Sequence, residues 1–93
     1  MTDLITASPD PVSPGGTLTI CFTLATLANQ TITLDLNNAL PPGDQDRRTS
    51  QVQIELNAAG YGCTTWTVPA SGWDGILIQH PDSDDHAVAV NPP

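Results

Sequence analysis

Two cysteines, Cys21 and Cys63, are the residues of this 93-residue chain with the best-defined chemistry. Their thiols can form a disulfide, which by its effect on the unfolded state would stabilise a small fold by about 4 kcal/mol. Such a bridge would indicate an oxidising compartment. Neither cysteine has a histidine close to it in the sequence, so a catalytic thiol is not expected. Free thiols are the alternative to a bridge.

A turn rich in carboxylates near the end of the chain has the residue types of a metal site. Hard cations such as Ca²⁺ prefer several oxygen ligands from a flexible loop. The segment offers three carboxylates and an imidazole, from Asp82, Asp84, Asp85 and His86. Their spacing differs from that of an EF-hand, and an ordinary solvated turn explains the segment equally well. We therefore expect no cofactor, with calcium as the alternative.

Two loops carry residues suited to contacts with a protein or glycan partner. Trp73 and Asp74 lie in a loop of small residues, where an exposed tryptophan can stack on a sugar ring or anchor a protein. The same tryptophan can instead cap the end of the core. Arg47 and Arg48 lie in a long polar loop at 38–50 and are expected to offset nearby aspartates. These four residues are the candidate partner contacts.

Charge and hydropathy exclude several classes of protein. Ten acidic residues against two basic ones, with no lysine, give a net charge of −8. This argues against nucleic acids and anionic membranes as partners, because both require a cationic surface. No apolar run approaches the roughly 20 residues of a membrane-spanning helix, and no nucleophile motif surrounds any serine, so neither membrane insertion nor enzyme activity is expected. The Thr-, Asn- and Asp-rich composition with two cysteines favours an extracellular or cell-surface domain, with a cytosolic protein as the alternative.

Apolar and polar residues alternate along most of the chain, which is the pattern of strands with one buried and one solvated face. Turn signals separate the alternating stretches at roughly ten-residue intervals, as in a two-sheet sandwich. The core face of most strands is even-numbered, and Trp66 belongs to it. Cys21 and Cys63 are odd-numbered, so both sulfurs are expected on outer faces. We predict one domain, residues 1–93, with strands at 3–8, 17–24, 31–37, 51–56, 62–68, 75–79 and 86–90.

Seven strands in about 90 residues, with the turn Val12-Ser13-Pro14-Gly15-Gly16 ahead of an alternating strand, resemble an immunoglobulin-like sandwich. The modules most similar in pattern are those of bacterial surface and cell-adhesion proteins. The resemblance implies an all-β, seven-stranded immunoglobulin-like two-sheet sandwich. It also implies that the domain is a spacer, part of an adhesin or an accessory module of a larger protein.

The resemblance leaves two geometries for a disulfide. In antibody-type domains a bridge crosses the core between the second and sixth strands, and Tyr61, two residues before Cys63, looks like that pattern. If the strand at 62–68 is instead the fifth, it pairs with the second in the same sheet. A cross-strand bridge would then lie on the outer face, in agreement with the odd numbering of both cysteines.

These observations favour a non-enzymatic extracellular or surface module that acts in binding, in adhesion or as a spacer. One alternative is a self-assembling subunit of a filament, surface layer or capsid-like shell, which threonine-rich strands and unpaired sheet edges would allow. A second alternative is a small calcium-binding domain built on the acidic turn.

Overall fold

A computed structural model of the chain describes residues 2–38 and 48–92. Within these residues, seven strands and one short 3₁₀ turn follow one another, which confirms the predicted all-β class. The elements are β1 (Ile5–Ser8), β2 (Thr17–Thr23), η1 (Ala25–Leu27), β3 (Thr31–Asn38), β4 (Thr49–Glu55), β5 (Tyr61–Thr67), β6 (Gly75–Gln79) and β7 (His86–Ala89).

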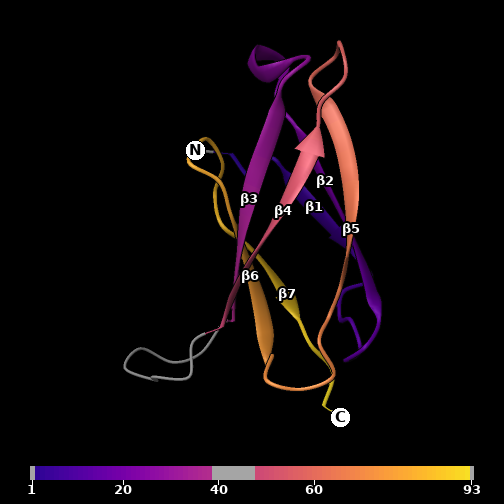
Figure 1. The fold of residues 1–93 in the computed structure, drawn as a ribbon. Coiled ribbons are helices and arrows are strands. Elements are labelled where there is room, and N and C mark those ends of the chain that lie inside the picture. Colours follow the sequence, from indigo (N-terminus) through magenta and orange to yellow (C-terminus); the bar gives the residue numbers. More distant parts are fainter. Residues whose placement is uncertain (1, 39–47, 93) are drawn as a thin grey trace.

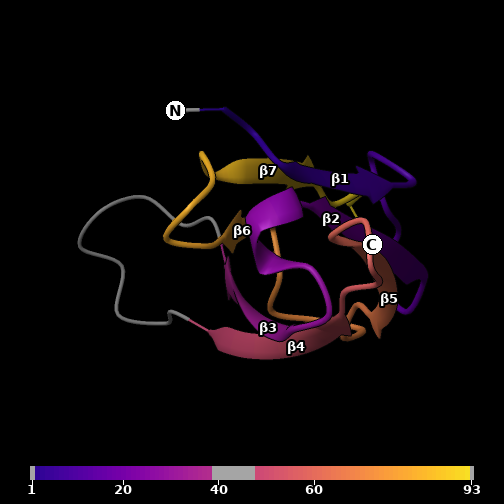
Figure 2. The same ribbon diagram turned by 90° about the horizontal axis from the view of Figure 1, so that it is seen from above.

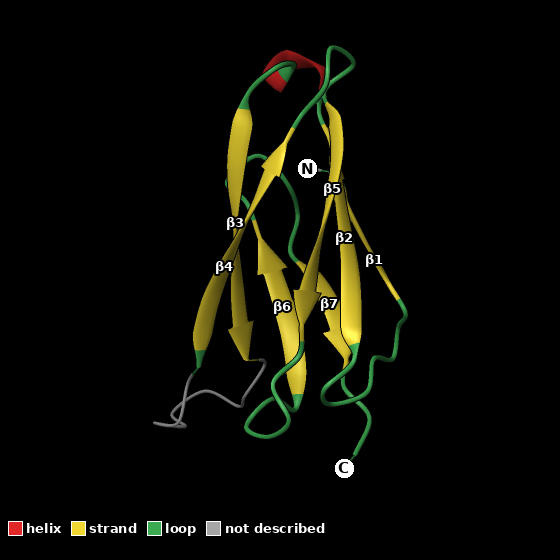
Figure 3. Ribbon diagram, turned by 45° about the vertical axis from the view of Figure 1, so that its right-hand side comes forward, coloured by secondary structure: helices red, strands yellow, loops and turns green. Residues whose placement is uncertain are grey.

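The strands form two antiparallel sheets that face each other (Figure 1, Figure 3). One sheet has three strands in the order β1-β2-β5, and the other has four in the order β4-β3-β6-β7. Seen from above, β1 lies beside β7 on one side of the sandwich and β5 lies near β4 on the other (Figure 2). A parallel bridge between Val12 and Val90 links the segments that follow β1 and β7. The sheets therefore approach each other along both sides.

Alternating side chains place the core between the two sheets, as the sequence pattern predicts. In β2, Leu18, Ile20 and Phe22 are completely buried, while the alternate residues are three exposed threonines and the half-buried Cys21. Burial of each large aliphatic or aromatic side chain contributes about 1.5–3 kcal/mol, so this layer is the main source of stability. The buried hydrophobic residues are Ile5, Val12, Leu18, Ile20, Phe22, Ile32, Leu34, Leu36, Val52, Ile54, Leu56, Val68, Trp73, Ile76, Ile78 and Val88.

The hairpin of β3 and β4 is longer than the sequence pattern predicts. The ladder continues through the pair Asn37–Thr49, and the Asn38 N–H donates to the Arg48 carbonyl oxygen at 2.9 Å. The prediction ended the first of these strands at Asn37 and assigned residues 38–50 to a loop, so Asn38, Thr49 and Ser50 are additional strand residues. Polar residues alone do not distinguish the outer face of a strand end from a loop.

The chain passes from the four-stranded to the three-stranded sheet through a tight turn between β4 and β5. The Asn57 Oδ1 atom accepts hydrogen bonds from two backbone N–H groups of the turn, at 2.9 and 3.1 Å. Gly60 has a φ of 80°, in the left-handed region that glycine adopts without penalty. A side chain at Gly62 would collide with the carbonyl oxygen of Glu55, so glycine allows the two strands to approach closely there.

Candidate functional site

Cys21 in β2 and Cys63 in β5 lie directly opposite each other and form a disulfide. Their sulfur atoms are 2.13 Å apart and their Cα atoms 4.0 Å apart. Strand alternation points both side chains away from the core, with Cys63 exposed and Cys21 half-buried. The cross-strand geometry is therefore the one formed. The through-core bridge and the free thiols are wrong, because β5 is the neighbour of β2 in the same sheet.

The outer face around the disulfide carries mostly threonines. Tyr61 is 46% exposed, and its hydroxyl lies 3.1 Å from the Cys63 Sγ atom. Because a bridged sulfur carries no proton, the hydroxyl is the donor. This face therefore offers hydroxyl groups and a disulfide, with no charged side chain among its outward positions. The outward residues of β1, β2 and β5 are Thr6, Ser8, Thr17, Thr19, Cys21, Thr23, Tyr61, Cys63, Thr65 and Thr67.

The acidic residues that follow β6 do not converge on a common point. The His86 Nδ1 atom lies 2.6 Å from the Asp3 Oδ2 atom, and Asp85 accepts a hydrogen bond from Gln79 at 3.3 Å. Within residues 2–38 and 48–92, no group of three or more His, Cys, Asp or Glu side chains could hold a metal ion. The side chains of Asp82, Asp85 and His86 face His80, Gln79 and Asp3 respectively, so the described residues give no geometric support to a calcium site. The expected ligands were Asp82, Asp84, Asp85 and His86.

Trp73 is buried, which corrects the expectation of an exposed binding residue. Only 7% of its surface is exposed, and its ring packs edge-on against Trp66, with the ring centroids 4.9 Å apart. The Asn38 side chain ties its loop to the end of β3, by donating to the Gly72 carbonyl oxygen (2.6 Å) and accepting from the Asp74 N–H (3.1 Å). Trp73 thus caps the end of the core, which is the alternative that the sequence left open.

Arg48 lies next to the loop that carries Trp73 and Asp74. It is exposed, and its side chain fills the space that a side chain at Gly72 would need. Arg47, the other arginine among the candidate contacts, lies outside the described residues. Of the four candidate partner contacts, Asp74 in this loop and Arg48 beside it are therefore exposed, whereas the Trp73 side chain is buried.

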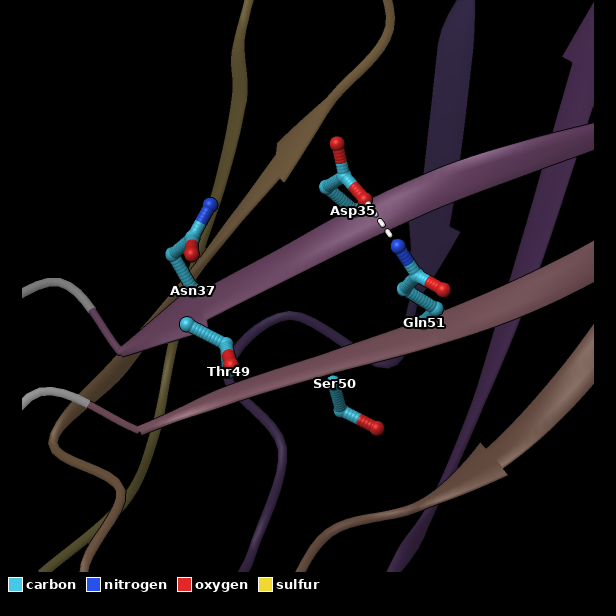
Figure 4. A pocket seen from close by; sticks show the side chains of 5 residues that line it. All are labelled: Asp35, Asn37, Thr49, Ser50 and Gln51. Carbon is cyan, nitrogen blue, oxygen red and sulfur yellow. Dashed lines mark hydrogen bonds between the residues drawn. The ribbon is translucent and has the colours of Figure 1, made fainter.

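A polar hollow of about 480 Å³ lies where β3 ends and β4 begins, and it is lined by Asp35, Asn37, Thr49, Ser50 and Gln51. Four of these residues form the cross-strand pairs Asp35–Gln51 and Asn37–Thr49. They lie on the outer face of the four-stranded sheet, opposite to the buried face of the same strands. The Gln51 Nε2 atom donates to the Asp35 Oδ1 atom at 2.9 Å, and the Ser50 side chain points away from the other four (Figure 4).

A row of hydrogen bonds continues from the hollow toward β6. The Asn37 Nδ2 atom donates to the Gln79 Oε1 atom at 2.5 Å, and the Gln79 Nε2 atom donates to the Asp85 carboxylate at 3.3 Å. The sequence analysis missed this set of residues. The available signal was the polar, odd-numbered face of two segments joined by a loop, since such segments pair as a hairpin and align their outward residues.

The described chain is a two-sheet antiparallel β-sandwich with an external cross-strand disulfide and a polar hollow on its larger sheet. No helix within the described ranges has the length and apolar character needed to cross a bilayer. The chain matches no family model, and comparison with curated proteins and with solved structures gives no significant match. A proposal about function therefore rests on the geometry alone.

Proposed function

We propose that the chain is a non-enzymatic, immunoglobulin-like module of an extracellular or cell-surface protein. In this proposal it binds a partner through the outer face of its four-stranded sheet. The observation that carries the proposal is the polar hollow, where one carboxylate, two amides and a hydroxyl from neighbouring strands face outward together. Convergent polar groups on rigid strands are what a binding site needs to orient a ligand.

The strand order supports the immunoglobulin-like assignment. In seven-stranded constant-type domains, the first, second, fourth and fifth strands face the third, sixth and seventh. The same order occurs here, except that β4 pairs with β3 instead of joining the sheet of β1, β2 and β5. This difference enlarges the sheet that carries the hollow. Together with a disulfide inside one sheet, it distinguishes the chain from antibody-type domains.

The disulfide supports the extracellular location. Bridges of this kind persist in oxidising compartments and are rare in the reducing cytosol. Because Cys63 is exposed on the sheet surface, a reducing environment would have direct access to it. Thiol counting on the denatured protein, purified without reductant, should find no free thiol. Two free thiols in that experiment would remove the support for an extracellular location.

Light scattering after size exclusion, over a wide concentration range without reductant, tests the module against the self-assembling alternative. A binding or display module should keep the monomer mass throughout. A defined oligomer or a growing polymer would contradict the proposal and favour a structural subunit, with pairing at the free edges of β1, β4, β5 or β7 as its physical basis.

A further inference from the structure

The hollow presents mainly hydrogen-bond acceptors. The Asp35 carboxylate has no hydrogen to donate. One N–H group of the Gln51 amide donates to Asp35, and one N–H group of the Asn37 amide donates to Gln79. These bonds use one of the two N–H groups of each amide. The carboxylate oxygens, the amide carbonyl oxygens and the hydroxyl oxygens then outnumber the donors that remain for a ligand. A ligand that donates several hydrogen bonds fits this chemistry.

The charge of Asp35 is not neutralised by a basic side chain within the described part of the chain. The ion pairs there both involve histidines, His80 with Asp82 and His86 with Asp3. Asp35 instead accepts a hydrogen bond from the neutral amide of Gln51. The whole chain has ten acidic residues, Asp35 among them, against two arginines, so its long-range potential attracts cations.

We propose that the hollow binds a basic side chain of a partner protein, and specifically the guanidinium group of an arginine. This inference rests on the proposed function and names the chemistry of the partner. A guanidinium is planar, donates five hydrogen bonds in a fixed fork and pairs bidentately with carboxylates. It can therefore contact the Asp35 carboxylate and the carbonyl oxygen of Gln51 or Asn37 together. The five lining residues include no aromatic ring, so a sugar would find no stacking surface in the hollow.

The size and position of the hollow agree with this occupant. Its volume of about 480 Å³ lies within the range of small-ligand sites and accommodates a side-chain head with part of its stem. The lining side chains stand on two paired strands, with Asp35 and Gln51 already joined by a hydrogen bond. A site held in this way loses little conformational entropy when the ligand binds.

Titration of the isotopically labelled protein with a short blocked peptide, followed by amide NMR shifts, tests the inference. The peptide carries one central arginine. Two control peptides carry lysine or the uncharged isostere citrulline at that position. We expect shifts concentrated on β3 and β4 around the hollow. The arginine peptide should bind more tightly than the lysine peptide, and the citrulline peptide should bind at least about tenfold more weakly.

Two charge variants separate a built site from general attraction to an acidic protein. Asp35→Asn removes the carboxylate from the hollow and keeps the shape of the side chain. Glu55→Gln is the matched control, because Glu55 is exposed on the same outer face of β4 and lies outside the hollow. Asp35→Asn should weaken the arginine peptide at least about tenfold, whereas Glu55→Gln should change its affinity less than about twofold.

Equal losses in the two variants, equal affinity for the citrulline peptide, or no binding at millimolar peptide would each overturn the inference. Shifts caused at the hollow by a neutral glycan and not by arginine would also overturn it. In that case the proposed binding function would stand with a different ligand class. A chain that polymerises would instead contradict the proposed function itself, so the two failures are distinguishable.

Discussion

Asn38 is a buried polar residue at one end of the sandwich, with 3% of its surface exposed. Its amide bridges β3 to the loop of Trp73 by donating to Gly72 and accepting from Asp74. A buried amide of this kind stabilises a fold only while both of its ends are paired, because an unpaired buried polar group costs its full desolvation energy. Asn38 therefore anchors the loop that carries the capping tryptophan.

Replacing Asn38 by alanine should lower the free energy of unfolding by about 1–3 kcal/mol, because two loop groups lose their partner. The matched control is Asn37→Ala, at the preceding position, whose side chain lies on the outer face, and it should cost less than about 1 kcal/mol. Urea denaturation followed by tryptophan fluorescence measures both variants. Equal costs would show that the bridge to the loop is not specific.

The Asp3 carboxylate is a second residue with a defined energetic role. Burial raises the pKa of Asp3, but hydrogen bonds from His86 and from the Ile5 N–H, together with the charge of His86, outweigh burial and hold the pKa below its ordinary value. The folded state therefore favours the charged carboxylate. The resulting stability is present above the ordinary pKa near 4 and is lost as the pH falls through the lower pKa of the folded state.

The wild type should lose free energy of unfolding as the pH falls below about 4, and Asp3→Asn should make this loss smaller. The Asp3 side chain is 39% exposed, so solvent screening limits the effect to about 0.2–1 kcal/mol. Urea midpoints of the wild type and the variant, compared between neutral pH and pH 2.5, give the difference that belongs to this group. If the urea midpoints of the wild type and the variant changed equally with pH, the stabilising role of the Asp3 carboxylate would be contradicted.

At the scale of elements, the pairing of β2 with β5 decides the chemistry of the cysteines. The register aligns Cys21 with Cys63, and the bridge closes a segment with a sequence separation of 42. Since the bridge lies on the outer face, the core can pack without it. Stabilisation therefore comes mainly from restricting the unfolded chain.

The double variant Cys21→Thr with Cys63→Thr should fold and lose about 4 kcal/mol of unfolding free energy. Threonine suits an outer cross-strand pair, and the neighbouring pair Thr19–Thr65 already has this composition. Circular dichroism should show an unchanged sheet spectrum, and urea denaturation should show the loss. A loss below about 1 kcal/mol would mean that the unfolded chain gains little freedom when the bridge is absent.

At the scale of the whole molecule, charge opposes folding. Ten acidic residues against two basic ones repel one another more in the compact state than in the expanded chain. Salt shortens the range of this repulsion, from about 30 Å at 0.01 M to about 3 Å at 1 M.

The melting temperature should therefore rise with NaCl, by roughly 4–8 °C for each 1 kcal/mol of repulsion that is screened. CaCl₂ at matched ionic strength is the control, and it should give the same shift if no calcium site forms. A larger rise in melting temperature with CaCl₂ would indicate a bound ion and would support the calcium-binding alternative. No rise with NaCl would show that the charges are already far enough apart.

The strands themselves were largely predictable, because period-2 alternation is a local property of the chain. The same alternation placed Leu18, Ile20 and Phe22 inside and both cysteines outside, and the structure agrees. The ends of β3 and β4 were not predictable. There, polar residues continue the ladder on an outer face, and Asn38 is polar yet buried.

By itself, the sequence determined the all-β class, the number of strands and the outward direction of the two sulfurs, since each depends on neighbours one or two residues away. The tertiary structure alone decided that β5 lies beside β2, that Trp73 caps the core and that Asp35 and Gln51 meet in one hollow. These features depend on pairing between segments far apart in the chain. Pairing of this kind is selected by the packing of the whole core, which no local pattern contains.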